Sequence, residues 1–326
     1  MKYYLCRTDA LENENPVTTP KNLVFSGGGI KGIAYLGVVK ALEELGVMQE
    51  VRRYSGASAG MIIASLLAIG MKGKELYRHM MAVDYKNFLE ESRVNIEELA
   101  DNPKMLLEPM TSALVLYDEV AYRGLCDGSY FTKWLIYMFR RKGFDDKTTY
   151  RQLYEATGKE LYCVLCNLNY GKTVIANHVD TPNMPVVASV RASMSIPFIY
   201  RPFEWEKDIY VDGGTMYNYP IEIFDEACPA DNTLGFILSS KDDILTPSRR
   251  EDKNLWQHIA CTYEAIRNVA NEYCFRGGNA YRTVFIDHKH ISTLDFDLTY
   301  EEKELLIKEG YQATYKYIIN GKTPVV

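Results

Sequence analysis

Short apolar runs alternate along the chain with longer stretches in which apolar residues recur every three to four positions. A short apolar run predicts a buried strand, and the longer period predicts a helix that buries one face. We expect strands near residues 22–26, 51–55, 161–168, 173–178, 209–212, 233–239 and 282–287. We expect helices near residues 31–45, 59–70, 72–81, 129–142, 149–156, 185–193, 254–275 and 300–320. This alternation is typical of a three-layer α/β/α sandwich around a largely parallel central sheet.

The length and composition fit a single domain. The chain has 326 residues, of which 47% are hydrophobic, and it carries no evident repeat. Its first residues lack the apolar stretch of a signal peptide, and the apolar run 61–71 is too short to span a bilayer. We therefore expect a soluble, cytoplasmic protein, with delivery to another cell as the alternative. The formal charge of −6 argues against strong nonspecific attraction to nucleic acid.

The cysteines carry no metal or redox signature. Cys163 and Cys166 form a C-x-x-C pair within an apolar run, and no second ligand pair lies nearby. We interpret them as two core thiols, so that neither a metal nor a cofactor is expected. The odd total of seven cysteines suits a reducing cytoplasm.

A nucleophile candidate lies between the second predicted strand and the helix that follows it. Gly56, Ser58 and Gly60 form a G-x-S-x-G pentapeptide in this strand-to-helix context, which a nucleophile elbow requires. A serine on such a tight turn leaves no room for side chains beside it, and glycines on both sides remove the clash. The pentapeptide by itself is also compatible with a plain turn.

A glycine-rich loop, residues 27–32, joins the first predicted strand to the next helix. Unpaired amides at a helix N-terminus bind an anion, which could be a dinucleotide pyrophosphate or a tetrahedral oxyanion. Gly27, Gly29 and Gly32 satisfy G-x-G-x-x-G, but the second strand ends at Ser58 rather than at a ribose-binding acid. The oxyanion is therefore favoured. Lys31 in this loop is expected to be solvated, with a lipid phosphate as the alternative partner.

A carboxylate is delivered into a glycine turn further along the chain. Asp212 ends the apolar run from residue 209 and precedes Gly213 and Gly214. Acidic residues before glycines are common in ordinary turns. A serine hydroxyl, however, needs a base to take its proton, and Asp212 is a candidate for that role beside Ser58.

Four blocks, in this order, resemble the patatin-like phospholipases, a family of lipid acyl hydrolases. They are the glycine loop, the elbow, the segment 191–197 and the turn 212–214. The resemblance covers about residues 21–220, and residues 294–297 with the closing helix also resemble bacterial members. It implies a Ser58 and Asp212 dyad without histidine, and an oxyanion hole of backbone amides. The implied donors are Gly27, Gly28 and Gly29, supported by Lys31, Gly32, Gly56, Gly60, Gly213 and Gly214.

Other mechanisms and functions remain open at this point. The chain order of Ser58, Asp212 and then His288 or His290 matches the triad order of α/β-hydrolases, although the histidines are more simply explained as a solvated turn. Such a triad would make the protein a carboxylesterase. A noncatalytic lipid-binding or interaction module on the same fold is a further alternative, and a dinucleotide-dependent enzyme is a third.

We predict the following domain organisation. Residues 1–20 are an N-terminal extension, residues 21–220 the catalytic core, and residues 221–326 the C-terminal part of the same domain. The less regular stretch 84–127 is a candidate lid or substrate wall. The helix near 129–142 ends in basic residues, and we expect it to pack on the sheet, with peripheral membrane contact as the alternative. The expected substrate is a phospholipid or related acyl lipid; no activating partner can be named.

Overall fold

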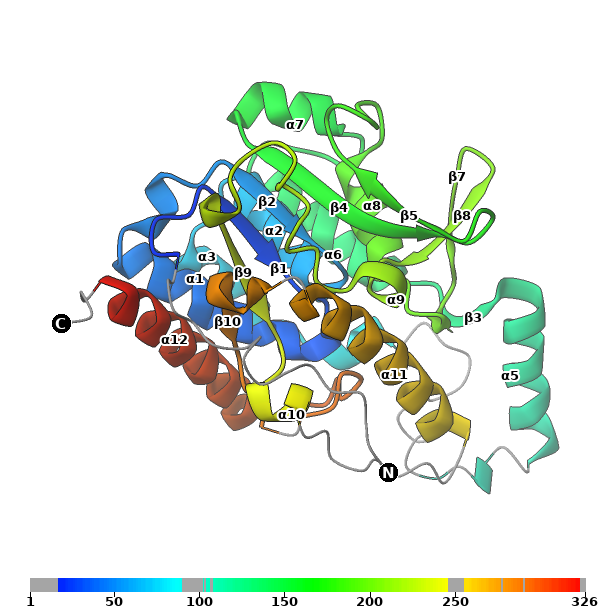
Figure 1. Cartoon of the computed structure of the whole chain (residues 1–326). Helices are drawn as coiled ribbons and strands as arrows, with labels where there is room; N and C mark the ends of the chain where they lie inside the picture. Colours follow the sequence, from blue (N-terminus) through cyan, green and yellow to red (C-terminus); the bar gives the residue numbers. More distant parts are fainter. Residues whose placement is uncertain are drawn as a thin grey trace.

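The protein is an α/β structure built on one eight-stranded sheet, with a separate pair of short strands (Figure 1). This computed structural model describes residues 17–89, 102, 104–105, 108–245, 255–276, 278–289 and 291–322. The strands of the main sheet are β1 (Asn22–Phe25), β2 (Arg53–Gly56), β4 (Glu160–Asn167), β5 (Lys172–Ala176), β7 (Phe203–Trp205), β8 (Asp208–Asp212), β9 (Thr233–Ile237) and β10 (Thr283–Phe285). The separate pair consists of β3 (Gly124–Cys126) and β6 (Phe198–Tyr200).

The order of the strands is β10-β9-β1-β2-β4-β8-β7, and β5 pairs with β4 beside this path. The five strands from β10 to β4 are parallel to their neighbours. β5 and β8 both run antiparallel to β4, and β7 runs antiparallel to β8. The expected fold class, with its largely parallel sheet, is therefore confirmed.

Helices cover both faces of the sheet (Figure 1). The α-helices of the described residues are α1 (Tyr35–Glu44), α2 (Ala59–Ala68), α3 (Gly73–Met81), α5 (Pro109–Tyr122), α6 (Ser129–Arg140), α7 (Tyr150–Thr157), α8 (Val186–Ser193), α9 (Gly214–Tyr217), α10 (Lys241–Leu245), α11 (Leu255–Arg276) and α12 (Tyr300–Lys322). The helix expected from residue 31 begins instead with 3-10 turns over Gly29–Ala34. α12 packs along α1, so that the C-terminal helix lies against the first βα unit.

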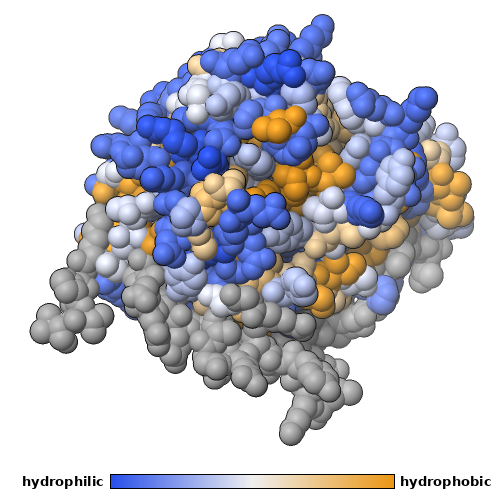
Figure 2. Space-filling view, turned by 45° about the horizontal axis from the view of Figure 1, so that its top comes forward, coloured by the Kyte–Doolittle hydropathy of each residue, from blue (hydrophilic) through white to orange (hydrophobic). Residues whose placement is uncertain are grey.

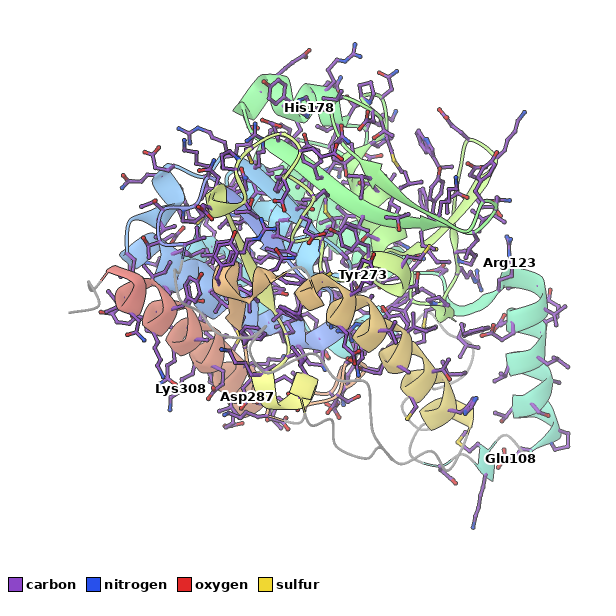
Figure 3. All side chains as sticks on the ribbon, in the orientation of Figure 1. Glu108, Arg123, His178, Tyr273, Asp287 and Lys308 are labelled. Atoms are coloured by element: carbon purple, nitrogen blue, oxygen red, sulfur yellow. The ribbon has the colours of Figure 1, made fainter. Side chains whose placement is uncertain are left out.

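The stretch 84–127 is more regular than expected. It contains the 14-residue helix α5, which runs along one edge of the molecule between Glu108 and Arg123 (Figure 3). Sequence periodicity missed α5 because Asp118 is its one buried side chain, so no apolar face repeats along it. β3, β6 and β7 were missed because each has three residues, too few to show a period of two. Residues 90–101, 103 and 106–107 of this stretch lie outside the described residues.

The core lies between the sheet and the helices on its two faces. Every residue of β1 is buried, and the Phe25 ring stacks on Phe236 with its centroid 5.2 Å away. Cys163 and Cys166 are buried free thiols on β4, as predicted. The prediction that helix α6 packs into the core is likewise confirmed, because Phe131, Leu135, Met138 and Phe139 are fully buried.

The surface shown in Figure 2 is mainly hydrophilic, and its apolar side chains gather in separate patches. Exposed apolar residues include Met110, Leu116 and Val120 of α5. Within the described ranges, no helix combines the length and the apolar character needed to cross a bilayer.

Candidate active site

The glycine loop and the elbow emerge side by side because the strands before them are neighbours. β1 and β2 are parallel and in register, with Phe25 opposite Gly56 at their carboxyl ends. A Cβ built on Gly27 would lie 3.1 Å from the Ser58 Cβ, so the loop crosses directly beside the serine. A Cβ on Gly32 would lie 2.8 Å from the Ala59 Cβ, which places the start of the next helix against the elbow.

Ser58 has the strained backbone of a nucleophile elbow. Its φ is 51° and its ψ is −125°, a conformation that residues with side chains rarely adopt. A Cβ on Gly56 would lie 2.5 Å from the Gly60 carbonyl carbon, and one on Gly60 would lie 2.2 Å from the Phe25 carbonyl oxygen. Both positions therefore require glycine, as the motif predicted.

Asp212 reaches Ser58 because β2 and β8 pair with the same edge of β4. On β4, Cys163 is opposite Gly56 of β2, and Leu165 is opposite Asp212 of β8. Two residues along a strand span about 7 Å, so the carboxyl ends of β2 and β8 face each other across this short gap. The Ser58 hydroxyl lies near enough to the Asp212 carboxylate to lower its pKa.

The Asp212 carboxyl group is fully buried, and one of its oxygens is held in place. Oδ1 accepts a hydrogen bond from the Gly214 amide at 2.7 Å, whereas Oδ2 has no hydrogen-bond partner among the described residues. Burial raises the pKa of Asp212 from 3.8 to about 6, and the hydroxyls of Ser58 and Tyr263, the Gly214 amide and the charge of Arg267 limit that rise. Asp212 is thus a stronger base than an exposed aspartate and has an oxygen available to take a proton.

The segment 191–197 holds both groups in place. The Ser58 amide donates to Ser193 Oγ at 2.9 Å, and Ser193 Oγ donates in turn to the Val164 carbonyl at 2.8 Å. The Asp212 amide donates to the Ser195 carbonyl at 2.9 Å. These contacts give the third sequence block a physical role, and they leave Ser193 and Ser195 as structural residues rather than nucleophiles.

The glycines around the site differ in what they do. The Gly27 amide donates to the Asn218 carbonyl at 3.1 Å, so the expectation that Gly27 serves as an oxyanion donor is wrong. The amides of Gly28 and Gly29 have no hydrogen-bond acceptor among the described residues, and Gly29 lines the pocket beside Ser58. A Cβ on Gly213 would lie 2.2 Å from the Val164 carbonyl oxygen, so the turn after Asp212 has no space for a side chain.

Lys31 is buried, so the expectation that it is solvated is wrong. It is 4% exposed, and its ammonium lies 3.7 Å from the carboxylate of Glu264 on α11. The segment that supplies Glu264 is more than 200 residues away in sequence, which is why local pattern could not predict the pair. Three further side chains at the site were not identified from the sequence. The side chains of Asn218 and Arg267 donate to the Gly27 carbonyl, and the Tyr263 hydroxyl lowers the pKa of Asp212.

His288 does not form a triad with Asp212. Its Nε2 lies 3.5 Å from the Asp243 carboxylate, and its Nδ1 makes no hydrogen bond among the described residues. Burial and the charge of Lys31 lower the pKa of His288 to about 4, so the ring is neutral at pH 7. The side chain is 17% exposed, so the expectation of a solvated turn is wrong at this residue. His290 lies outside the described residues.

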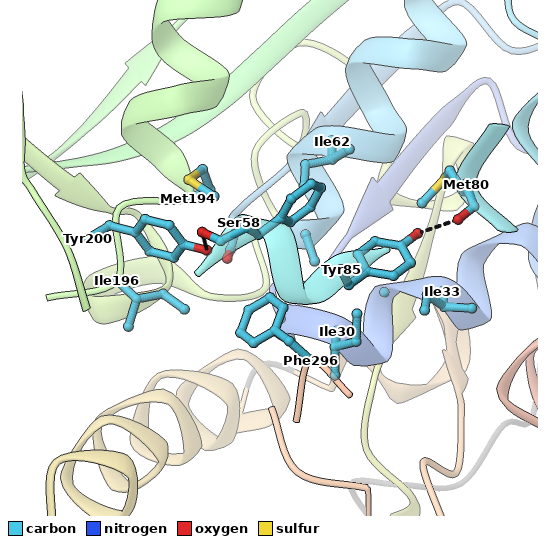
Figure 4. A pocket seen from close by; sticks show the side chains of 14 residues that line it. Ile30, Ile33, Ser58, Ile62, Met80, Tyr85, Met194, Ile196, Tyr200 and Phe296 are labelled. Atoms are coloured by element: carbon cyan, nitrogen blue, oxygen red, sulfur yellow. Dashed lines mark hydrogen bonds between the residues drawn. The ribbon is translucent and has the colours of Figure 1, made fainter. Parts of the chain in front are cut away.

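Ser58 opens into a pocket whose walls are almost entirely apolar. Figure 4 shows Met194 and Tyr200 on one side of Ser58, and Tyr85 and Met80 on the other. The lining residues are Gly29, Ile30, Gly32, Ile33, Ser58, Ala59, Ile62, Met80, Tyr85, Phe88, Met194, Ile196, Tyr200 and Phe296. Tyr85 and Phe88 come from the stretch suggested as a lid or substrate wall, and they form part of this wall. Such a surface favours a hydrocarbon chain over a polar substrate.

Comparisons with known proteins identify the family of this chain. The patatin-like phospholipase family model matches residues 23–225, and the chain belongs to that family. An uncharacterized protein of Acanthamoeba polyphaga mimivirus is 28% identical over 306 residues, which are 92% of this chain and 94% of that protein. A probable lipid hydrolase of Invertebrate iridescent virus 6 is 29% identical over 203 residues, 62% of each protein.

The solved structure of VipD from Legionella pneumophila is similar in fold, with a TM-score of 0.58 and 20% sequence identity. The match covers 93% of this chain and 67% of that one. Membership of this family supports lipid hydrolase activity.

Proposed function

We propose that the protein is a serine acyl hydrolase that cleaves fatty-acyl esters of phospholipids or related lipids with a Ser58 and Asp212 dyad. The observation that carries this proposal is the meeting of a strained serine, a buried carboxylate of raised pKa and an apolar pocket at one point. The pocket takes the acyl chain, and its apolar wall excludes water from the bound ester.

The chemistry proceeds in two steps. Ser58 Oγ attacks the ester carbonyl carbon while its proton passes to Asp212 Oδ2, and the carbonyl oxygen becomes an oxyanion. The tetrahedral intermediate collapses, and the leaving alcohol takes the proton from Asp212. Water then attacks the acyl-enzyme and gives a proton to Asp212; collapse returns that proton to Ser58 and releases the fatty acid.

The backbone amides of Gly28 and Gly29 stabilise the oxyanion in both steps. Two observations support this role: both amides lack an acceptor among the described residues, and Gly29 borders the same pocket as Ser58. In other acyl-transfer enzymes one such donor contributes about 3 to 4 kcal/mol. With a pKa of about 6, Asp212 is close to histidine in base strength, and these donors supply the stabilisation of the oxyanion that a base cannot provide.

The test is lipid-product mass spectrometry after incubation with mixed vesicles and, separately, with triacylglycerol emulsion. We expect fatty-acid release by the native protein and none by Ser58→Ala or Asp212→Asn. Ser65→Ala is the matched control, because Ser65 is also buried on α2 but bonds the Ile62 carbonyl. Fatty-acid release that survives either dyad substitution contradicts the assigned roles.

Two further measurements separate the alternatives. The double variant His288→Ala with His290→Ala retains hydrolysis if the dyad is correct, and a loss as large as that of Ser58→Ala would restore the triad. A fluorophosphonate labels the native protein but not Ser58→Ala. Vesicle binding with neither labelling nor hydrolysis would identify a noncatalytic lipid-binding module instead.

A further inference from the structure

A buried arginine on α11 contacts the glycine loop from outside the part of the chain that the family model matches. Arg267 is 3% exposed and lies beyond residues 23–225. Its Nη2 donates to the Gly27 carbonyl at 2.9 Å, and its Nε donates to Asn218 Oδ1 at 3.3 Å. Its Nη1 donates to Thr293 Oγ1 at 3.0 Å and to Glu264 Oε1 at 3.2 Å. The guanidinium is therefore held in one orientation by four acceptors.

The same network holds the glycine loop at both ends. Arg267 holds the Gly27 carbonyl, and three residues later the Ile30 amide donates to the Thr293 carbonyl at 3.2 Å. A Cβ on Gly29 would lie 2.1 Å from that carbonyl oxygen, which shows how closely the loop lies against residue 293. Gly28 and Gly29 are the two residues between these anchors.

One peptide plane connects Arg267 to a proposed oxyanion donor. The Gly27 carbonyl and the Gly28 amide belong to the same peptide, which is trans, so the two groups point in opposite directions. A hydrogen bond from a cation to the carbonyl fixes that plane and polarises it, which strengthens the amide at its other edge as a donor.

We propose that Arg267 is a positioning residue of the oxyanion hole, which orients and polarises the Gly27–Gly28 peptide so that the Gly28 amide stabilises the reacting oxygen. This inference rests on the proposed acyl hydrolase function. The residue acts through the loop and does not touch substrate. Through this residue α11 takes part in the chemistry indirectly, although the family motifs lie elsewhere in the chain.

Arg267 also affects the base. The titratable groups that face Asp212 are Tyr263 and Arg267 from α11, and Cys163 and Cys166 from β4. Burial raises the pKa of Tyr263 and of both thiols, so these three groups are neutral at pH 7. Arg267 is the permanent charge in this set, and it lowers the pKa of Asp212. Activity should fall at low pH as Asp212 becomes protonated, and we call this fall the acid limb of the pH profile. Removing the charge of Arg267 should raise the pKa of Asp212 and move the acid limb to higher pH.

The experiment compares Arg267→Met, which removes the charge, with Arg267→Lys, which keeps a charge but loses the planar set of donors. Steady-state hydrolysis of a dispersed short-chain ester is measured from pH 4 to 9. For Arg267→Met we expect kcat to fall at least about tenfold with KM within about twofold, and the acid limb to shift upward. For Arg267→Lys we expect a lower kcat with the acid limb near its native position.

Arg282 offers a matched control. It is also buried, at 1% exposure, and pairs with Asp225 without a contact to the glycine loop or Asp212. Arg282→Lys should lower stability without moving the acid limb. This control distinguishes the loss of any buried arginine from the loss of Arg267. Thermal unfolding of each variant shows which of them fold.

The outcomes are separable. If the folded Arg267 variants keep kcat within about twofold and the acid limb stays in place, the inference is wrong. If Arg267→Met does not fold, kcat and the acid limb of Arg267→Lys and Thr293→Val test the inference instead. Thr293→Val removes one acceptor that orients the guanidinium. A native protein that hydrolyses no ester overturns the proposed function, and with it this inference; an active native protein with unaffected variants overturns the inference alone.

Discussion

Titration of Asp212 should control both activity and stability. The carboxyl group is buried, and its pKa is raised from 3.8 to about 6, chiefly because burial disfavours the charged form. Since Asp212 must be ionised to accept the Ser58 proton, kcat/KM should fall below about pH 6, by roughly tenfold for each further pH unit. An exposed aspartate would place this limb about two pH units lower.

The same pKa shift makes stability fall as pH rises, whereas activity rises with pH. The folded-state pKa of Asp212 lies above its unfolded value, so the group contributes stability that is fully present below pH 3.8 and is lost as pH rises through about 6. At about 1.4 kcal/mol per pKa unit, the rise from 3.8 to about 6 corresponds to about 3 kcal/mol. Asp212→Asn cannot ionise and should not show this loss.

Two assays measure these effects. The pH profile of kcat/KM, from pH 4 to 8 with an ester that carries no titrating group, locates the acid limb. Urea unfolding of the native protein and of Asp212→Asn at pH 4 and at pH 8 gives the change in stability. Most of the expected change falls between these two pH values. Asp208→Asn, at the other end of β8, is the control and should leave the acid limb in place.

Two results would contradict this account of Asp212. If the acid limb lies below pH 5, or if the stability difference between native protein and Asp212→Asn stays constant from pH 4 to 8, burial does not set the properties of this carboxylate. A limb that moves with Asp208→Asn would assign the titration to another group.

Three further predictions follow from the local geometry. Ser58→Gly should abolish hydrolysis yet raise the free energy of unfolding by about 1 kcal/mol, because glycine tolerates the strained φ of 51°; Ser65→Gly, within α2, should lower it, and urea titrations that rank them otherwise would refute the strain. Gly60→Ala should destabilise by more than about 2 kcal/mol in the same assay, because its Cβ would meet the Phe25 carbonyl oxygen at 2.2 Å; a small change would show that the elbow relaxes. Ser193→Ala should cost about 1 to 3 kcal/mol and slow fluorophosphonate labelling, because the Ser58 amide loses its acceptor; an unchanged labelling rate would contradict its positioning role.

Much of the site was predictable from the sequence because its parts are local. The elbow needs small residues on both sides of Ser58 within five positions, and the steric reason for them acts between near neighbours. The glycine loop likewise follows a buried strand and begins a helix. The parallel pairing of the first two strands, which brings these parts together, also follows the general rule for consecutive βα units.

Other features required distant segments to meet. Asp212 lies near Ser58 because β8 pairs antiparallel with the edge of β4, and this pairing leaves no periodic signal in a five-residue strand. The buried pairing of Lys31 with Glu264, and the bond from Arg267 to the loop, join residues more than 200 positions apart.

The sequence by itself determined the chemical groups, the turns that present them and the class of fold. The tertiary structure decided which amides are already occupied, as at Gly27, and which charges are buried, as at Lys31. The physical reason is range: steric limits on a turn act within a few residues, whereas burial and hydrogen-bond partners depend on what the folded chain packs against each group.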